Sequence, residues 1–310
     1  MNAEYGKSRV AIIGTGRVGT DLLFKTLSSC YVEPVAFVGR NRNSEGLSIA
    51  RDLGIEVSSD GIDFLRENAD SFDYLFDATS ADSHRLNNIV FQQIQKFIID
   101  LTPARLGHFC VPSINLRESA RHSNVNMITC GGQAALPLAH ALRQSTSDIE
   151  YLEIVSSISS RSAGIATREN IDEYLTTTET SLIRFSGTKR AKAILNINPA
   201  YPDVCMQTTV YAYAIFGDFE KIAACVSAME KAVKRYVPGY EIVLPPVLDK
   251  DRITLSLTVH GRGDFLPKYA GNLDIINCAA VAVAEYKHQA DSRTEVQFAK
   301  ENIDQRSYSA

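Results

Sequence analysis

The chain has 310 residues, of which 45% are hydrophobic and 22% charged, and 32 basic against 36 acidic side chains leave a net charge of −4. This composition is typical of a folded globular protein of about two domains, and it excludes disorder over most of the chain. No basic excess is present to neutralise phosphates, no apolar run is long enough to span a bilayer, and the start lacks the apolar core of a secretory signal. We therefore expect a cytoplasmic protein that binds neither nucleic acid nor membrane.

The six cysteines stand at positions 30, 110, 130, 205, 225 and 278, with no C-x-x-C pair, and the six histidines are not spaced as metal ligands. The sequence therefore predicts no metal site. A chain of this length builds its core without disulfides, so we expect reduced thiols, most of them packed as small buried hydrophobes. His84 follows a predicted strand, where it either lines a ligand site or is a hydrogen-bonded loop residue.

The first part of the chain alternates short apolar strands with helices. Strands are predicted at residues 9–13, 35–38, 74–78 and 97–101, and helices at 20–29, 44–53 and 87–95. The continuous apolar run at 9–13 is typical of a strand buried on both faces. This alternation predicts a doubly wound parallel sheet with right-handed crossovers, an α/β fold.

The pattern changes after about residue 128. Residues 152–159 alternate and are rich in β-branched side chains, further strands are predicted at 191–196, 204–214 and 253–259, and residues 219–233 have the spacing of an amphipathic helix. These elements predict a separate α+β domain. From Tyr286 the sequence is polar, and we expect a frayed or disordered tail.

Gly14, Gly16 and Gly19 form a G-x-G-x-x-G motif between a predicted strand and a predicted helix. In such a loop the first glycine permits the tight turn, the second lets the backbone approach a pyrophosphate, and the third lets the helix pack against the strand. The helix N-terminus then offers free N–H groups to the phosphates. We expect a dinucleotide site here; a glycine-rich turn with no ligand is the alternative.

The end of the second strand bears on which dinucleotide is bound. A carboxylate is expected there to bind the ribose 2′-hydroxyl of NAD, but residues 39–44 read GRNRNS. Arg40, Arg42 and Ser44 could hold the 2′-phosphate of NADP, or the arginines are solvated surface charges. The sequence leaves NAD or NADP open.

Cys130 stands where a predicted strand meets Gly131, Gly132 and a predicted helix. The dipole at a helix N-terminus stabilises a thiolate, and the glycine pair leaves room for a substrate and frees backbone N–H groups for an oxyanion. A nucleophilic cysteine next to a nucleotide-binding domain predicts hydride transfer through a thiohemiacetal. Packing of a buried thiol is the alternative.

Many blocks, in the same order along roughly residues 9–284, resemble the acylating acetaldehyde dehydrogenase family. They are GTGRVGTDL (14–22), FDATS (76–80) with His84, DLTPA (100–104), NVNM (124–127), TCGGQA (129–134), EIV (153–155), SISS (157–160), SAG (162–164), TR (167–168), NIDE (170–173), YVPGY (236–240) and LPKYAGNLDI (266–275).

This resemblance implies the fold of aspartate-semialdehyde and glyceraldehyde-3-phosphate dehydrogenases. A Rossmann domain would comprise residues 1–128 with a returning helix at 272–290, an α+β catalytic and dimerisation domain residues 129–271, and a polar tail residues 291–310. The family converts an aldehyde, here most simply acetaldehyde, with NAD and CoA into acyl-CoA and NADH, reversibly. Its members are homodimers that usually pair with a 4-hydroxy-2-oxovalerate aldolase.

The resemblance also implies roles for individual residues. Cys130 matches the nucleophile that carries the acyl thioester, and Asn272 matches the asparagine at the nicotinamide end of the cofactor. The phosphate loop corresponds to Thr15, Gly16, Arg17 and Val18 within the glycine motif, and a second nucleotide-binding stretch to Ser162, Ala163, Gly164, Ile165, Ala166, Thr167, Arg168, Glu169 and Asn170.

Three departures from the family pattern concern the site. The usual Met-Arg-Asp-Thr-Val-Tyr reads MQTTVY at residues 206–211, with Thr208 in place of the acid; the usual Gly-Ile-Asp reads GRN at 39–41; and a usual Pro-Gly reads IA at 165–166. A threonine is a poor base. Either proton transfer at the thiol is altered, or the change is neutral because water or the CoA thiol handles the proton.

Two other functions compete with a CoA-acylating aldehyde dehydrogenase. One is an NADPH-dependent reductase of a different acyl thioester on the same fold. The other is a non-catalytic nucleotide-binding partner of an aldolase. Formation of an acyl adduct on Cys130 separates the enzymes from the non-catalytic subunit.

Overall fold

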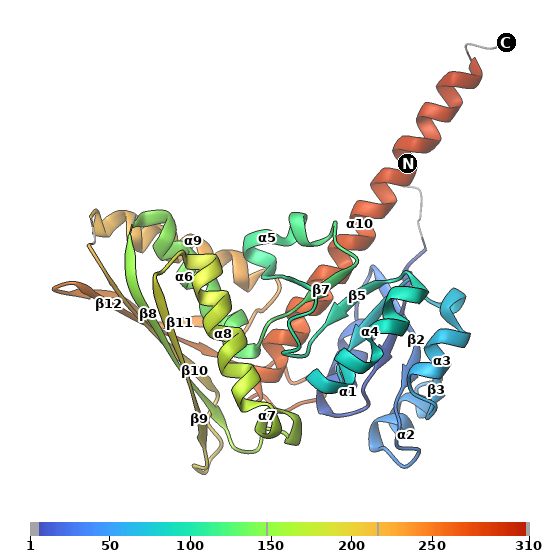
Figure 1. Ribbon diagram of the computed structural model, residues 1–310, viewed down its shortest axis with the longest axis horizontal. Helices are drawn as coiled ribbons and strands as arrows, with labels where there is room; N and C mark the ends of the chain where they lie inside the picture. Colours follow the sequence, from blue (N-terminus) through green and yellow to red (C-terminus); the bar gives the residue numbers. More distant parts are fainter. Residues whose placement is uncertain (1–5, 147, 216, 308–310) are drawn as a thin grey trace.

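The computed structural model describes residues 6–146, 148–215 and 217–307, and the side chains of all of these except 165, 166 and 294–307. Two β-sheets lie side by side, and a long C-terminal helix runs along the first of them (Figure 1).

The first sheet has seven parallel strands in the order β3-β2-β1-β4-β5-β7-β6. The strands are β1 (Ser8–Ile13), β2 (Val32–Val38), β3 (Glu56–Ser58), β4 (Tyr74–Asp77), β5 (Phe97–Asp100), β6 (His108–Phe109) and β7 (Asn124–Asn126). The connecting helices are α1 (Arg17–Leu27), α2 (Glu45–Asp52), α3 (Ile62–Glu67), a single 3₁₀ turn (Ala69–Ser71), α4 (Ala81–Ile94) and α5 (Pro112–Ser119). The predicted parallel sheet is confirmed.

The apolar run at the start of β1 is explained by helices on both faces of this sheet. Val10 and Ile12 belong to one buried cluster, whereas Ala11 and Ile13 belong to another. Successive strand residues point to opposite faces, so every position along β1 has to be apolar.

The second sheet is mixed, with the order β11-β12-β10-β8-β9, in which only β8 and β9 are parallel. The strands are β8 (Ile149–Ser159), β9 (Arg190–Asn198), β10 (Met206–Ala214), β11 (Tyr240–Asp249) and β12 (Arg252–Val259). Helices α6 (Cys130–Ser145), α8 (Ile171–Ser186) and α9 (Phe219–Lys234) cover one face, and α7 (Ile165–Glu169) precedes α8. Within the described residues the other face carries no helix (Figure 1).

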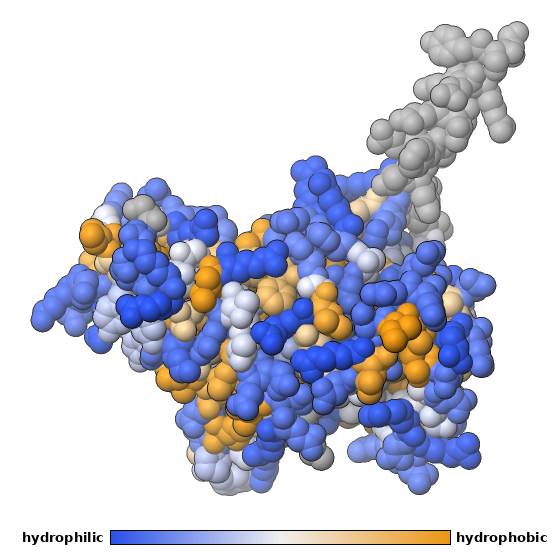
Figure 2. All heavy atoms as spheres, viewed as in Figure 1, coloured by the Kyte–Doolittle hydropathy of each residue, from blue (hydrophilic) through white to orange (hydrophobic). Residues whose placement is uncertain are grey.

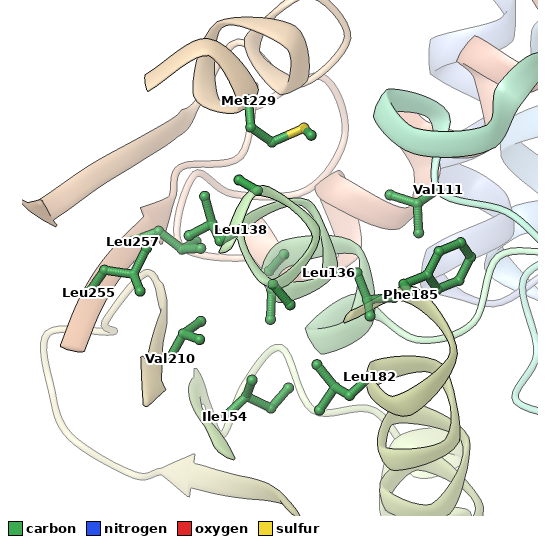
Figure 3. Packing of buried hydrophobic residues seen from close by; sticks show 14 of the residues in the cluster. Val111, Leu136, Leu138, Ile154, Leu182, Phe185, Val210, Met229, Leu255 and Leu257 are labelled. Carbon is green, nitrogen blue, oxygen red and sulfur yellow. The ribbon is translucent and has the colours of Figure 1, made fainter. Parts of the chain in front are cut away.

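The core of this second half is centred on α6, which runs between the sheet and α8. Figure 3 shows Leu136 and Leu138 of α6 among Val210 and Leu257 from the strands and Leu182 from α8; all five are fully buried. This packing fixes α6, and therefore its first residue, Cys130, against the sheet.

The last helix, α10 (Gly271–Ser307), returns to the first sheet, where Ala279, Ala280 and Val283 join its buried cluster. The prediction of a frayed tail from Tyr286 is wrong for the backbone, because the helix continues to Ser307. The polar stretch contains neither glycine nor proline and is rich in helix-forming residues. Its first part still contacts the first sheet, because His288 bonds Ser8 and Asp291 accepts from Tyr74, both at 2.9 Å. Farther along, the helix leaves the body of the molecule (Figure 1).

The face of the molecule seen in Figure 2 is mainly hydrophilic, with apolar residues in small separate groups. Among the described helices, none has both the length and the apolar character needed to cross a membrane.

Candidate active site

A pocket of about 480 Å³ lies at the carboxyl ends of β1, β4, β5 and β7, where they meet α6 and the start of α10. Ligands of doubly wound sheets bind at this edge, where neighbouring strands lead to opposite faces. The lining residues are Gly16, Arg17, Val18, Ala78, Thr79, Ser80, Leu101, Thr102, Pro103, Ile128, Thr129, Cys130, Ser162, Gly164, Thr167, Asn170, Tyr174, Asn272, Leu273 and Ile276.

The three glycines of the motif meet three different local demands. Gly14 has φ +109°, and a Cβ there would lie 2.5 Å from the backbone of Ala78. A Cβ on Gly19 would lie 1.8 Å from the carbonyl oxygen of Gly14, so the helix packs directly on the loop. A Cβ on Gly16 would meet no atom within 4 Å, so at this position the chain itself does not require glycine. The open space suits the close approach of a ligand to the backbone.

Helix α1 starts directly after Gly16, and no side chain caps its N-terminus. The first N–H groups of a helix have no intrahelical partner and attract anions. Together with the space above Gly16, this end of the pocket fits a pyrophosphate.

Asn272, at the other end of the pocket, is 1% exposed, and neither its amide oxygen nor its amide nitrogen has a hydrogen-bond partner within the described part of the chain. Leaving buried polar groups unpaired is costly. A ligand with both a donor and an acceptor, such as the carboxamide of nicotinamide, would satisfy both atoms.

The residues after β2 do not decide between NAD and NADP. Arg40 and Arg42 are exposed and do not line the pocket, and the hydroxyl of Ser44 donates to the carbonyl of Thr15 at 3.1 Å. Ser44 therefore supports the glycine loop. The geometry leaves NAD and NADP open.

The stretch 162–170 contributes only part of the predicted set. Ser162, Gly164, Thr167 and Asn170 line the pocket, whereas Ala163 is buried behind it and Glu169 is exposed outside it. Arg168 turns back to donate to the Ala163 carbonyl at 3.2 Å and the Ser160 hydroxyl at 3.0 Å. The side chains of Ile165 and Ala166 lie outside the described residues. Of the other predicted residues, Gly14, Thr15, Gly19 and Arg40 also stay outside the pocket lining.

Cys130 is the first residue of α6 and lies half-buried in the pocket, as its place in the sequence indicated. The sequence predicted that the N–H groups of Gly131 and Gly132 would stabilise an oxyanion. The N–H of Gly132 is already engaged, because it donates to the capping hydroxyl of Thr129 at 2.9 Å. Burial raises the pKa of Cys130, against the opposing effects of the Tyr174 hydroxyl and nearby backbone N–H groups.

Two residues before Cys130, the backbone of Ile128 has φ +65°. This left-handed conformation is strained for a β-branched side chain and is held here by full burial and by the Ile128 N–H, which donates to Asn126 Oδ1 at 2.9 Å. The tight turn from β7 into α6 is what brings the thiol to the edge of the sheet.

Behind the pocket, His84 lies on α4 and is fully buried, so it is not the loop residue that the sequence suggested. Its Nδ1 is 2.8 Å from Asp77 and its Nε2 is 3.3 Å from Asp100. These carboxylates accept the backbone N–H groups of Thr79 and Thr102, both of which line the pocket. His84 therefore holds the two strand ends together rather than contacting a ligand.

All six cysteines are free, as expected, but the expectation that most are buried is wrong. Cys110 and Cys278 are buried, Cys30 is exposed, and the others are half-buried.

The structure brings together one histidine group that sequence spacing did not reveal. The ligand atoms of His108, Glu118 and His122 lie within 4.8 Å of one another. The two imidazole rings stack at 4.0 Å with an angle of 10° between them. Because ring lone pairs lie in the ring planes, two stacked rings cannot point at one ion without reorienting.

The sequence did not identify Tyr174 as a neighbour of the thiol, and it could not say how far Thr208 lies from the thiol. The hydroxyl of Tyr174, on α8, lies 3.8 Å from Cys130 Sγ. Thr208 is fully buried in β10, outside the pocket lining, and its hydroxyl is 2.9 Å from that of Ser156. Nothing local marks Tyr174, because it is 44 residues from Cys130 along the chain.

A parallel sheet with a glycine-rich phosphate loop, and a cysteine in the same pocket, define a nucleotide-dependent oxidoreductase of the dehydrogenase class. Residues 130–267 match the family model described as prokaryotic acetaldehyde dehydrogenase, dimerisation. The chain is 59% identical over 288 residues to an acetaldehyde dehydrogenase of Burkholderia thailandensis, covering 93% of this chain and 97% of that protein.

Two more distant relatives agree. An acetaldehyde dehydrogenase of Pectobacterium atrosepticum is 49% identical, over 90% of this chain and 95% of the relative, and one of Carboxydothermus hydrogenoformans is 44% identical, over 90% and 93%. The chain belongs to the acetaldehyde dehydrogenase family. It is an enzyme that carries the family's dimerisation domain, which supports a homodimer.

Proposed function

We propose that this enzyme is a CoA-acylating acetaldehyde dehydrogenase that converts acetaldehyde, NAD or NADP, and CoA into acetyl-CoA and the reduced dinucleotide. The observation that carries the proposal is the placement of Cys130 in one pocket with the glycine loop and with the unpartnered amide of Asn272. The similarity to relatives named acetaldehyde dehydrogenase supports the same substrate.

The residues present fit a dinucleotide. The N–H groups at the start of α1, with Gly16 and Arg17, would hold the pyrophosphate, Asn272 the nicotinamide carboxamide, and Ser162, Gly164, Thr167 and Asn170 the remainder. The cofactor supplies a hydride acceptor when bound. Arg40 and Arg42 would add a charge-assisted contact to a 2′-phosphate, so we propose that NADP is accepted as well as NAD.

The chemistry of the chain itself is carried by Cys130. The thiol first loses its proton to solvent. The thiolate then forms a bond to the aldehyde carbonyl carbon while the carbonyl π bond breaks to give an oxyanion, and loss of a hydride, for which the bound dinucleotide would be the acceptor, restores the carbonyl and leaves a thioester on Cys130. The N–H of Gly131 is the backbone donor nearest to the new oxyanion. The thiol of CoA, after losing its proton, then attacks the thioester, and Cys130 leaves as the thiolate.

The assembly we propose is a homodimer formed through the uncovered face of the second sheet. A 4-hydroxy-2-oxovalerate aldolase that delivers the volatile aldehyde is the partner implied by the family resemblance. We further propose that residues 1–128 with 272–290 form the dinucleotide-binding domain and residues 129–271 the catalytic and dimerisation domain.

The experiment that tests the function follows the absorbance of the reduced dinucleotide with acetaldehyde, with and without CoA, for NAD and NADP separately. We expect turnover that depends on CoA and is abolished in Cys130→Ser, which keeps the shape of the side chain but removes the soft nucleophile. Equal rates with and without CoA would contradict an acylating reaction. Unchanged activity of Cys130→Ser would contradict the role of the thiol.

A further inference from the structure

A chain of buried hydroxyl groups leads from the second sheet to the thiol. The hydroxyls of Thr208 and Ser156, on the neighbouring strands β10 and β8, lie 2.9 Å apart. The Ser156 hydroxyl is a hydrogen-bond partner of the Tyr174 hydroxyl, which lies 3.8 Å from Cys130 Sγ. Ser156 and Thr208 are fully buried and lie outside the pocket lining, whereas Tyr174, which is 7% exposed, lines the pocket beside Cys130.

The backbone of α6 is shaped around the tyrosine. A Cβ at Gly131 would lie 2.1 Å from the Tyr174 hydroxyl oxygen and 3.2 Å from that of Ser156. Only glycine leaves room for the phenol to reach across the first turn of α6 toward the sulfur. The glycine after Cys130 thus has a second purpose, apart from making space for a substrate.

The charge on the sulfur sets the direction of its bond to the phenol. In the neutral thiol, the S–H of Cys130 donates to the Tyr174 oxygen at 3.8 Å. The ionised sulfur has no proton and can only accept, so the single proton of the phenol is the one that can bond it. Between Ser156 and Thr208 either hydroxyl can be the donor.

We propose that Tyr174 is a catalytic residue that donates a hydrogen bond to the sulfur of Cys130, and that Ser156 and Thr208 are positioning residues that orient it. The phenol stabilises the thiolate both before attack on the aldehyde and when the thiolate leaves the thioester. It acts as a donor and not as a base, because burial keeps it protonated. This deepens the proposed function and rests on it for its purpose, but the hydrogen bond itself is testable on the thiol alone.

The arrangement gives Thr208 a definite part. Its hydroxyl is hydrogen-bonded to that of Ser156, and hydrogen bonds in series polarise one another. Of the residues lining the pocket, the charged or titratable side chains besides Cys130 are Tyr174 and Arg17, and Arg17 is exposed and donates to the Arg161 carbonyl. The thiolate therefore depends on dipoles and hydroxyls.

The test measures the rate at which iodoacetamide alkylates Cys130 in the full-length enzyme, between about pH 6 and pH 10, with peptide mass spectrometry to separate Cys130 from the other cysteines. In Tyr174→Phe we expect the apparent pKa of Cys130 to rise by about one unit, and alkylation at neutral pH to slow about tenfold. Thr208→Val and Ser156→Ala should shift the apparent pKa in the same direction by a smaller amount, and Thr208→Ser should restore it.

Tyr151→Phe is the matched control, because it removes a phenol hydroxyl that bonds Glu153 on the same sheet and not the thiol. An unchanged pKa of Cys130 in Tyr174→Phe would overturn the proposal, and an unchanged pKa in both Ser156→Ala and Thr208→Val would overturn the positioning part. A wild-type thiol that depends on Tyr174 but never forms an acyl adduct would instead contradict the proposed function.

Discussion

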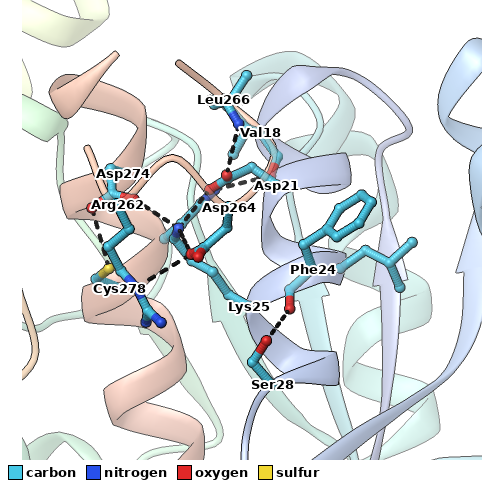
Figure 4. Close-up of polar contacts among 12 residues, drawn as sticks. Val18, Asp21, Phe24, Lys25, Ser28, Arg262, Asp264, Leu266, Asp274 and Cys278 are labelled. Carbon is cyan, nitrogen blue, oxygen red and sulfur yellow. Dashed lines mark hydrogen bonds and ion pairs between the residues drawn. The ribbon is translucent and has the colours of Figure 1, made fainter. Parts of the chain in front are cut away.

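The Nζ atom of Lys25 on α1 lies 2.7 Å from Oδ1 of Asp274 on α10, and this contact ties the helix after the glycine loop to the helix that carries Asn272. Figure 4 shows the lysine enclosed by Asp21, Asp264 and Asp274, with Nζ at 3.2 Å and 2.9 Å from the first two. Burial alone would lower the pKa of Lys25, but Cys278 and the carboxylates raise it. The ion cluster therefore fixes the positions of α1 and α10, which form the two ends of the pocket, relative to each other.

Replacing Lys25 by methionine should therefore destabilise the enzyme strongly. The change leaves buried carboxylates without their cation, which costs about 3–5 kcal/mol in the free energy of unfolding. Lys189→Met is the matched control, because Lys189 contacts Asp148 and Glu150 entirely at the surface, and it should change stability little. Denaturant unfolding measures both; equal effects would show that the Lys25 cluster has no special role.

The buried group of Asp77, His84 and Asp100 predicts a pH dependence of stability. Burial opposes the charge on His84, but the two carboxylates raise its pKa above the ordinary 6.5. Burial raises the pKa of Asp100 from 3.8 to about 6, against the effect of His84. In both cases the folded state holds a proton more tightly than the unfolded state, so this group loses stability as pH rises, Asp100 between 3.8 and about 6 and His84 above 6.5.

Comparing denaturant unfolding of the wild type with that of Asp100→Asn from about pH 4 to pH 8 tests this sign, since one unit of pKa corresponds to about 1.4 kcal/mol. The free energy of unfolding of the wild type minus that of Asp100→Asn should fall as pH rises, because only the wild type has a carboxyl group at this position to titrate. A value that rises toward pH 8 would mean that the assigned directions are wrong.

The preference for cofactor is tested at Arg40. Arg40→Ala should weaken NADP binding about tenfold through loss of a charge-assisted contact, and leave NAD binding unchanged. Arg51→Ala serves as the control, because Arg51 is also an exposed arginine but lies farther along the chain, on α2. Calorimetric titration with each dinucleotide gives the affinities. If NADP binds Arg40→Ala as it binds the wild type, then Arg40 is only a surface charge.

The proposed dimer surface is tested at Ile194. This side chain is 41% exposed on β9 and follows the inward-facing Ala193, so it points to the uncovered face of the sheet. Ile194→Asp should raise the dimer dissociation constant at least about tenfold, because a charge would be buried at the interface. Ile183→Asp on α8, where the isoleucine is 45% exposed, should not. Sedimentation velocity distinguishes the two, and a fully dimeric Ile194→Asp would exclude this face.

Much of the fold could be predicted from the sequence, because β1 and the glycine motif are strong local signals. Several short elements, and two of the longer ones, could not. Helix α8 is rich in threonine, a weak helix former, and Thr176, Thr178 and Thr180 each donate to the carbonyl four residues earlier. Strand β11 contains Pro245 and Pro246, which argue against a strand, and it is tolerated because it lies at the sheet edge.

The candidate site was predictable where it is local and not where it is assembled by tertiary contacts. Cys130 at the start of a helix follows from its neighbours in sequence. The hydroxyl chain from Thr208 to Tyr174 does not, because it joins β10, β8 and α8, and no pattern in any one of them reports the other two. The raised pKa of Cys130 also depends on burial, which the helix N-terminus alone did not indicate.

The most direct measurement of the central claim is the intact mass of the enzyme after incubation with acetyl-CoA, followed by peptide mapping. We predict a mass increase of one acetyl group per chain, located on Cys130 and absent in Cys130→Ser. The adduct should disappear when free CoA is added in excess, because the thioester is an intermediate. No adduct, or an adduct on another cysteine with Cys130 unmodified, would contradict the account.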